Sequence, residues 1–415
     1  MDASALTRRR DEPGLLEAVA LAAENLDQLV VGAVRDVHGS VADRVHGAVD
    51  LVAGHRTLPH LVHDGIAGGV YAGLGLAFRG AARGLRLADE HGLGPSADTT
   101  PRGRFVISAV NGLIGDQLLA DGSALAIEIG VRRQGRDVPL TPAGLRAAFP
   151  EATGALVVFL HGLCETEDYW NRRSRPRRHD GSSAPSYGAG LAGDGWSPIW
   201  VRANTGVPVA EAGAALASLL GRLVDAWPTE VRRIALVGHS MGGLIARAAC
   251  GVATDVDRPW TDRVTDVVTL GTPHTGSPVE RTIARGVRWA SGRRDLLPLT
   301  RIFERRSVGV LDLHDGMPDD ATHLPHARYR LVAATLTRSP RHPLATTVGD
   351  YLVPYRSAVG LLPGDEPLFP GADVLHIPNA HHFDLLNHDD VHAALRQWLA
   401  ADPSHGSTRT ENPHE

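Results

Sequence analysis

Ser240 lies in the segment Gly238-His239-Ser240-Met241-Gly242-Gly243, whose residue types and spacing can turn a serine hydroxyl into a nucleophile. A hydroxyl reacts poorly unless it is held exposed beside a base. Glycines two positions before and two positions after the serine permit the sharp turn that exposes it, because a Cβ there would collide with backbone. A helix starting at the serine would stabilise negative charge that develops nearby. The segment predicts that Ser240 is a nucleophile, and the alternative is a glycine-rich turn that only opens a helix.

The elements that must position Ser240 are predicted on both sides of it. Residues 234–237 form a short apolar strand, and residues from 244 onward have helical spacing. Further strands are predicted at 155–160, 198–202, 264–270, 329–335 and 372–377, and further helices at 210–225 and 391–399. This alternation predicts an α/β fold whose mostly parallel sheet is covered by helices on both faces. Residues 124–132 and 137–140 flank the turn-like Gln134-Gly135-Arg136 and predict a hairpin.

Four segments together resemble the α/β-hydrolase superfamily, and within it the bacterial triacylglycerol lipases and esterases. Residues 159–163 (Phe-Leu-His-Gly-Leu) resemble the oxyanion segment, and residues 238–243 resemble the nucleophile elbow. Residues 269–277 (Thr-Leu-Gly-Thr-Pro-His-Thr-Gly-Ser) resemble a lipase signature. Residues 349–354 resemble the Gly-Asp-x-x-Val-Pro acid loop. The resemblance covers about residues 125–399. It implies an α/β-hydrolase fold and a serine esterase or lipase, without a metal or organic cofactor.

The resemblance also implies which groups stabilise the oxyanion. Acyl transfer builds negative charge on the carbonyl oxygen, and two backbone N–H groups must point at it. By resemblance these are the amides of Leu163 and Met241, while Gly238, His239 and Gly242 complete the elbow around Ser240. The alternative for the segment before Leu163 is a simple turn after a strand.

Asp350 is the acid that the family pattern selects. In this family the chain order is serine, acid, histidine, and Asp350 follows the strand at 329–335 within the acid loop. Three other carboxylates compete with it: Asp266, Asp365 and Asp384. The first is near the start of a strand, at the wrong end of a parallel sheet for a site. Asp365 is in a Gly/Pro turn, and Asp384 is better explained as a cap.

The histidine is one of two adjacent residues, His381 and His382, that follow the strand at 372–377. Related lipases carry a His-x-Asp-Leu-Leu pattern here, followed by a helix that ends in Trp-Leu. That pattern selects His382, and His381 stays as the alternative. His388 and His392 extend these two into a cluster, but no Glu, Cys or further ligand stands at metal-ligand spacing. We therefore expect no zinc site.

Composition excludes several other classes of protein. The chain has 415 residues and a net charge of −5, which argues against a nucleic-acid partner. It contains no lysine, as in proteins of GC-rich bacterial genomes, so a Schiff base or a P-loop lysine is excluded. The basic run at 172–179 is interrupted by serine and proline and is typical of a solvated loop. Two cysteines and no clear signal peptide favour a cytoplasmic protein that could associate with a membrane surface.

Residues 1–100 are expected to be a helical N-terminal segment outside the resemblance. Within it, residues 65–87 are rich in Gly and Ala, which favours a helix packed tightly against a neighbour. The alternative is an interfacial helix that makes peripheral contact with a membrane or an acyl substrate. Residues 91–103 are rich in Gly, Pro, Ser, Asp and Thr and are expected to be a linker.

The catalytic domain is expected to span residues 105–400. An insertion at 276–324 falls between two strands and carries apolar residues, which makes it a candidate lid or cap over the pocket. Residues 401–415 are polar and are expected to be disordered.

These patterns predict a carboxylic-ester hydrolase that uses Ser240, Asp350 and His382 on a small-molecule or lipid ester. Two alternatives stay open. One is an acyltransferase or amidase with the same three residues, because fold and triad do not determine the acceptor. The other is a catalytically silent protein whose N-terminal helices bind a partner or a membrane. The acyl chain length and the oligomeric state have no signature in the sequence.

Overall fold

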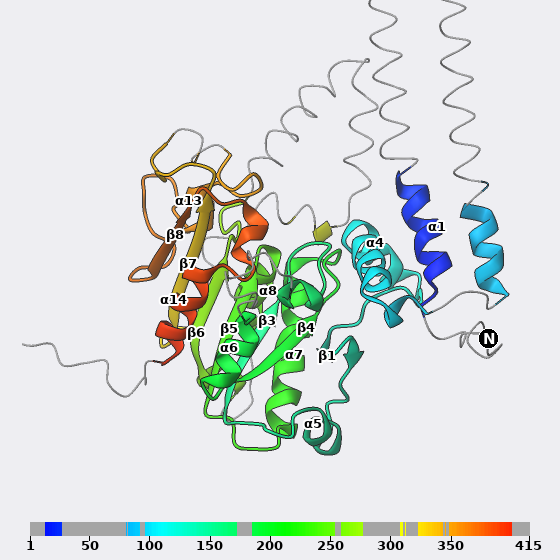
Figure 1. Ribbon diagram of the computed structural model, residues 1–415, viewed down its shortest axis with the longest axis horizontal. Coiled ribbons are helices and arrows are strands. Elements are labelled where there is room, and N and C mark those ends of the chain that lie inside the picture. The colour runs from blue at the N-terminus through cyan, green and yellow to red at the C-terminus, as the bar shows by residue number, and fades with distance from the viewer. Residues whose placement is uncertain are drawn as a thin grey trace, which may run out of the picture. The chain divides into compact units, whose positions relative to one another are not determined.

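The computed structural model describes residues 13–26, 80, 82–91, 96–171, 185–253, 259–276, 308–309, 312, 323–342, 345 and 348–400 (Figure 1). The chain divides into two compact units. One comprises residues 1–127 and 279–314, and the other comprises residues 128–278 and 315–415. The predicted lid at 276–324 and the tail at 401–415 lie almost entirely outside the described residues.

The described part of the N-terminal unit is helical, as expected. It holds α1 (Leu15–Leu26), an α-helical segment at 82–90, the 3-10 helix η3 (Ala97–Thr99) and α4 (Pro101–Ala120). Its apolar core joins α1, η3 and α4 through a cluster of buried residues: Ala18, Ala97, Ile107, Val110 and Leu118. The segment that was a candidate for membrane contact, residues 65–87, lies mostly outside the described residues, which leave out 65–79 and 81. No helix in the described residues is both long and apolar enough to cross a membrane.

The prediction of a linker at 91–103 is wrong for the second half of that range. Thr100 caps α4, because its side chain accepts a hydrogen bond from the Gly103 N–H at 3.1 Å, and Pro101 fits the first turn, where no amide partner is needed. Gly103 is required there, since a Cβ on it would lie 2.1 Å from the Ala97 carbonyl oxygen. The helix therefore begins inside the stretch whose composition resembles a linker.

The predicted hairpin is present but shorter than expected. It consists of β1 (Gly130–Arg133) and β2 (Arg136–Asp137), and the turn residues Gln134 and Gly135 both have positive φ, at 52° and 75°. Residues 124–129 do not extend β1. The Asn111 side chain donates to the Leu125 carbonyl at 2.7 Å and accepts from the Ile127 N–H at 2.9 Å, so it takes backbone groups that a strand partner would need.

The second unit is built on an eight-stranded sheet in the order β2-β1-β4-β3-β5-β6-β7-β8. The remaining strands are β3 (Ala155–Leu160), β4 (Ser197–Arg202), β5 (Arg233–His239), β6 (Val264–Leu270), β7 (Arg328–Thr335) and β8 (Asp373–Pro378). β1 is antiparallel to β4, and the strands from β4 to β8 are parallel. The predicted mostly parallel sheet is confirmed.

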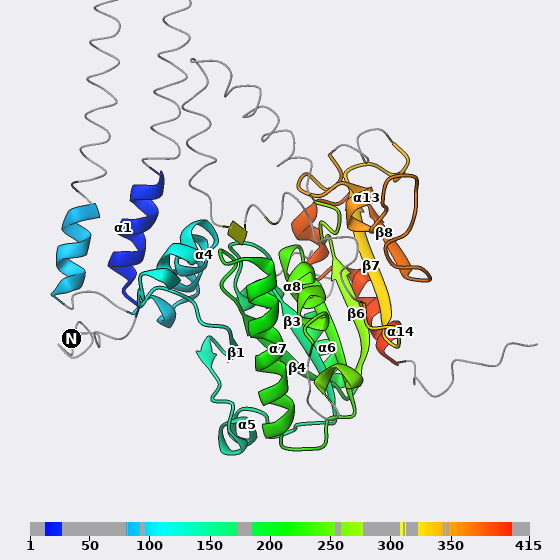
Figure 2. The same ribbon diagram turned by 180° about the vertical axis from the view of Figure 1, so that it is seen from behind.

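Helices cover both faces of this sheet. They are α5 (Pro142–Ala148), α6 (Tyr187–Gly193), α7 (Val209–Ala226), α8 (Met241–Cys250), α13 (Tyr355–Ala358) and α14 (Asp389–Ala400), with short 3-10 turns η4 (Glu167–Asn171), η5 (Trp260–Arg263) and η7 (His382–Leu385). α7 packs on α8 over one face, and α6 and α14 cover the other (Figures 1 and 2). Alternate strand residues such as Val157, Phe159 and Val237 join the core under α6 and α14. Since the central strands are parallel, their carboxyl ends meet at one edge, where loops can assemble a site.

Candidate active site

Ser240 occupies a strained turn between β5 and α8. Its backbone has φ 52° and ψ −123°, a conformation rare for a residue with a side chain. The Ser240 N–H donates to the Leu270 carbonyl at 2.8 Å, which ties the turn to the end of β6. A Cβ on Gly238 would lie 2.5 Å from the Gly243 nitrogen, and one on Gly242 would lie 2.4 Å from the Leu160 carbonyl oxygen. The glycines are therefore required by close backbone approach, as their spacing predicted.

The signature at 269–277 supports this turn from β6. The Thr272 hydroxyl donates to the Ser240 carbonyl at 2.9 Å. The same hydroxyl fills the space beside Gly243, where a Cβ would meet it at 2.1 Å. Further along the signature, the Thr275 N–H donates to Ser357 Oγ at 3.2 Å. These bonds give the signature a structural role around the turn.

His274 of the same signature is a buried neutral imidazole. Its Nδ1 lies 3.3 Å from an Arg247 guanidinium nitrogen, and its Nε2 lies 3.1 Å from Thr269 Oγ1. Burial, together with Arg247 and His323, holds the pKa of His274 well below its ordinary value. It accepts from Arg247 and donates to Thr269, and we assign it to packing rather than to chemistry.

Asp350 and His382 form a buried pair. Oδ2 of Asp350 lies 2.7 Å from Nδ1 of His382, and only 0% and 2% of the two residues is exposed. The other carboxylate oxygen, Oδ1, accepts the N–H groups of Leu352 and Val353 at 3.0 and 2.8 Å. The His382 N–H donates to the Asp350 carbonyl at 3.0 Å. The carboxylate thus orients the imidazole, and Nδ1 must be the protonated nitrogen that faces it.

The competing residues lie elsewhere. His381 is exposed and pairs with Asp384, with Nε2 and Oδ1 3.2 Å apart. Asp266 is buried in ion pairs with Arg328 and Arg330 at 3.1 and 3.2 Å.

Asp365, the last competitor, is exposed and pairs with Arg356 on the surface. Of the four carboxylates weighed in the sequence, Asp350 is the one that contacts His382.

Two residues next to the serine turn, Gly271 and His239, lie close to the His382 ring. A Cβ on Gly271, the residue after the Ser240 partner Leu270, would lie 3.1 Å from His382 Cε1 and Nδ1. The His239 and His382 rings are 4.7 Å apart between centroids. Ser240 Oγ forms no hydrogen bond with a described protein group in this conformation. Catalytic hydrogen bonds of this kind are commonly long in free enzymes and tighten with substrate bound.

The segment after β3 lies directly beside Ser240. A Cβ on Gly162 would be 3.0 Å from Ser240 Cβ. The Gly162 N–H is already engaged, because it donates to Glu165 Oε2 at 2.7 Å. The amides of Leu163 and Met241, which the family resemblance selected, donate to no protein acceptor among the described residues. An unengaged N–H group at both positions is what the oxyanion assignment requires.

His161 fixes the start of this segment. Its Nε2 accepts the Ala203 N–H at 3.1 Å, so Nδ1 donates to the Gly162 carbonyl at 2.9 Å. Burial lowers the pKa of His161, although the nearby Glu165 and Glu167 oppose this. The neutral ring serves as a brace for the turn.

Glu165 is the residue of this site that the sequence did not indicate. It is 3% exposed and joins the Gly162 N–H to the His239 ring, whose Nδ1 lies 3.0 Å from its carboxylate. His239 is fully buried and reaches the His382 carbonyl through Nε2 at 3.3 Å. Nothing in the sequence pairs residues so far apart, and the only signal is an acidic residue next to the oxyanion segment.

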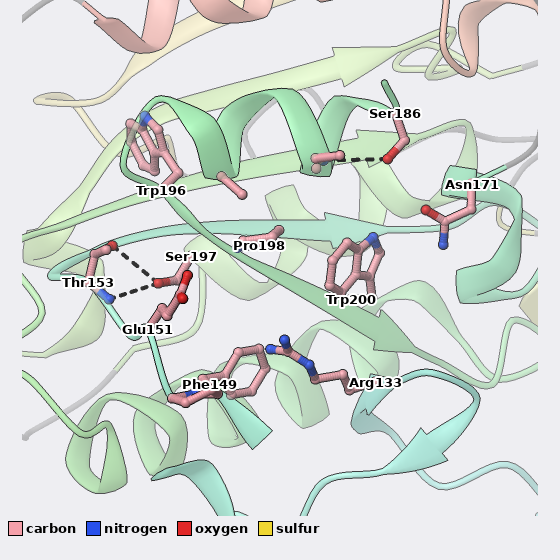
Figure 3. Close-up of a pocket in the computed structure, with 14 residues that line it drawn as sticks. Arg133, Phe149, Glu151, Thr153, Asn171, Ser186, Trp196, Ser197, Pro198 and Trp200 are labelled. Carbon is pink, nitrogen blue, oxygen red and sulfur yellow. Dashed lines mark hydrogen bonds between the residues drawn. The ribbon is translucent and has the colours of Figure 1, made fainter. Parts of the chain in front are cut away.

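A separate cavity of about 650 Å³ lies away from these residues (Figure 3). Three aromatic side chains face it: Phe149 from the end of α5, Trp196 from the loop before β4, and Trp200 from β4. The Arg133 guanidinium lies over the Phe149 ring, 4.8 Å from its centroid. None of the residues described above for the serine site lines this cavity.

The described residues contain no group of three or more His, Cys, Asp or Glu side chains placed to hold a metal ion. Two members of the sequence cluster, His388 and His392, have other surroundings. His388 Nδ1 accepts the Asp390 N–H at 3.2 Å, and the His392 ring packs on Tyr187 with centroids 5.6 Å apart.

Comparisons with known proteins find one family model and several solved structures that are similar to parts of this chain. A family model described as PGAP1-like alpha/beta domain matches residues 214–286, which include the Ser240 turn. No curated protein sequence matches the chain significantly. Among solved structures, the mature Bacillus licheniformis lipase BlEst2 is 19% identical over 59% of this chain and 91% of that chain, with a TM-score of 0.41. The Pyrococcus furiosus esterase PF2001 is 15% identical over 60% and 82%, with a TM-score of 0.39.

Carboxylesterase CesB from Bacillus subtilis is 14% identical over 60% of this chain and 85% of that chain, with a TM-score of 0.35. The topology and the matched domain define the class of protein: the chain has an α/β-hydrolase fold. The fold class predicted from the sequence, a mostly parallel sheet with helices on both faces, is confirmed.

Proposed function

We propose that this protein hydrolyses carboxylic esters through a Ser240–Asp350–His382 triad and an acyl-enzyme intermediate. One observation carries the proposal. A buried carboxylate orients the His382 ring at 2.7 Å, and Ser240 stands in a strained turn at the end of a parallel strand, tied to the residue before Gly271, which in turn lies against that ring. This arrangement supports nucleophilic catalysis by Ser240.

In the first half of the reaction, His382 Nε2 takes the Ser240 hydroxyl proton as Oγ bonds to the ester carbonyl carbon. The carbonyl electron pair moves onto oxygen, where the Leu163 and Met241 N–H groups stabilise the negative charge. The oxyanion then re-forms the carbonyl, the ester C–O bond breaks, and His382 gives its proton to the leaving alkoxide. Asp350 stabilises the imidazolium that exists between these proton transfers.

In the second half, water replaces the alcohol. His382 takes a proton from water as the hydroxyl oxygen bonds to the acyl carbon, and the same N–H groups hold the new oxyanion. Collapse breaks the bond to Ser240 Oγ, which recovers its proton from His382, and a carboxylic acid leaves. An alcohol or amine in place of water would give the acyltransferase alternative with the same residues.

The lipase-like segments at 159–163, 238–243, 269–277 and 349–354 support an ester as the substrate. The test is hydrolysis of a p-nitrophenyl ester series of increasing acyl length by wild type and Ser240→Ala. We expect turnover by wild type and a loss of about 10⁶-fold in kcat for the variant. Equal rates for the two proteins would contradict the proposal, and cleavage of matched anilides instead of esters would favour an amidase.

A further inference from the structure

Glu165 and His239 connect the three parts of the proposed site through buried hydrogen bonds. Glu165 Oε2 accepts the Gly162 N–H at 2.7 Å, which anchors the segment that carries the Leu163 amide. The Glu165 carboxylate also lies 3.0 Å from His239 Nδ1. On the other side of the ring, His239 Nε2 lies 3.3 Å from the carbonyl oxygen of His382. One pair of side chains therefore spans the oxyanion segment, the serine turn and the base.

The chemistry of these contacts determines the protonation of His239. Both of its ring nitrogens face atoms that can only accept: the Glu165 carboxylate and the His382 carbonyl oxygen. A neutral imidazole has a single N–H and could satisfy only one of them. An imidazolium satisfies both, and the carboxylate of Glu165 balances its charge.

Electrostatics agree with this reading. Burial lowers the pKa of His239, but the Glu165 carboxylate, its hydrogen bond and the His382 carbonyl outweigh it, so that the pKa is raised. Burial likewise opposes ionisation of Glu165, but His239 and the Gly162 N–H bring its pKa below the ordinary value. The rings of Trp170 and Phe383 lie beside that of His239, with centroids 6.4 and 6.2 Å from it.

We propose that Glu165 and His239 are positioning residues, a buried ion pair that holds the backbone of the base His382 and the oxyanion segment in register with Ser240. The inference rests on the proposed function. Asp350 already holds His382 by its ring and by its N–H. The His239 bond to the His382 carbonyl is the contact that ties the base to the strand carrying the serine. Displacement of a catalytic group by about 1 Å can cost a hundredfold in rate.

The test is steady-state hydrolysis of a p-nitrophenyl ester by wild type, Glu165→Gln, His239→Gln and His239→Phe. We expect Glu165→Gln and His239→Phe to lose about ten- to a hundredfold in kcat. KM should change less than about twofold, because neither residue is proposed to touch substrate. His239→Gln should retain more kcat than His239→Phe, since its amide can still donate to the His382 carbonyl. Glu230→Gln, on an exposed residue, is the matched control and should behave as wild type.

A second measurement does not depend on the variants folding. In ¹⁵N-histidine-labelled wild type near pH 7, both ring nitrogens of His239 should carry protons, and a neutral ring would overturn the inference. In the kinetics, a Glu165→Gln kcat equal to wild type, or equal losses for His239→Gln and His239→Phe, would also overturn it. No turnover by wild type would overturn the proposed function itself. Wild-type turnover with an unaffected Glu165→Gln would overturn the positioning role alone.

Discussion

The Nδ1 atom of His382 lies 2.7 Å from Oδ2 of Asp350, and both side chains are withdrawn from solvent. The carboxylate cannot turn away, because its second oxygen accepts two backbone N–H groups from the residues that follow it. The imidazole is thereby held with one nitrogen protonated and the other available as a base.

Asp350→Asn should lower kcat by about 10⁴-fold, because an amide can neither set the tautomer of His382 nor stabilise the imidazolium. Asp365→Asn is the matched control, since Asp365 is an exposed carboxylate that pairs with Arg356 at the surface. The measurement is kcat on a p-nitrophenyl ester. A similar loss for both variants, or none for Asp350→Asn, would argue against Asp350 as the acid.

The same assay should distinguish the two adjacent histidines by their effects on kcat. His382→Ala should lower kcat by about 10⁴-fold or more, since it removes the general base. His381→Ala should keep kcat within about threefold of wild type. Its ring is exposed and pairs with Asp384, and exposed ion pairs contribute little. If instead the His381 variant were the inactive one, the assignment of the base would be wrong.

Much of the sheet could be predicted because buried parallel strands are continuous apolar runs. Strands β3 and β6 were predicted at their observed residues, and the helices predicted at 210–225 and 391–399 differ from α7 and α14 by only one or two residues at their ends. Helix α4 was missed because Gly103, Gly112 and Gly115 break its apolar pattern. Its start was nevertheless marked by Thr100 and Pro101, a cap and a first-turn proline.

The site could be predicted only where its residues carry local motifs. Ser240 and Asp350 stand in recognisable segments, and the choice of His382 over its neighbour depended on the following Asp-Leu-Leu pattern. Glu165 has no such pattern. Its role depends on contact with His239, 74 positions along the chain, and such a pairing arises only when β3 and β5 lie side by side in the sheet.

Gly242→Ala should destabilise the protein, because the new Cβ would lie 2.4 Å from the Leu160 carbonyl oxygen and the backbone would have to shift. We expect a loss of roughly 1–3 kcal/mol in the free energy of unfolding, together with loss of ester hydrolysis. Gly221→Ala in α7 is the control: its Cβ would meet nothing within 4 Å, so it should stabilise by about 0.5–1 kcal/mol. Denaturant unfolding measures both, and equal effects would contradict this account of the turn.

The ion pair of Glu165 and His239 predicts a pH window for stability. The pKa of Glu165 is lowered in the folded state, so its contribution is present above about pH 4.5 and is lost as the pH falls below that value. The pKa of His239 is raised, so its contribution is complete below about pH 6.5 and is lost as the pH rises through the folded value. The charged and titratable groups facing the pair are His161, Cys164, Asp350 and His382.

The difference in free energy of unfolding between wild type and Glu165→Gln should therefore be largest between about pH 4.5 and 6.5 and shrink on either side. Chemical denaturation of both proteins across this range measures it. A difference that does not vary with pH would mean that the pair is not ionised in the folded protein.

The most direct test of the account is covalent labelling of Ser240 by a fluorophosphonate probe, read by peptide mass spectrometry. The account predicts one modified peptide, carrying the label on Ser240, in wild type. It predicts no labelling of Ser240→Ala and much slower labelling of His382→Ala. Wild type that stays unlabelled, or a label that persists in Ser240→Ala, would contradict the assignment of Ser240 as an activated nucleophile.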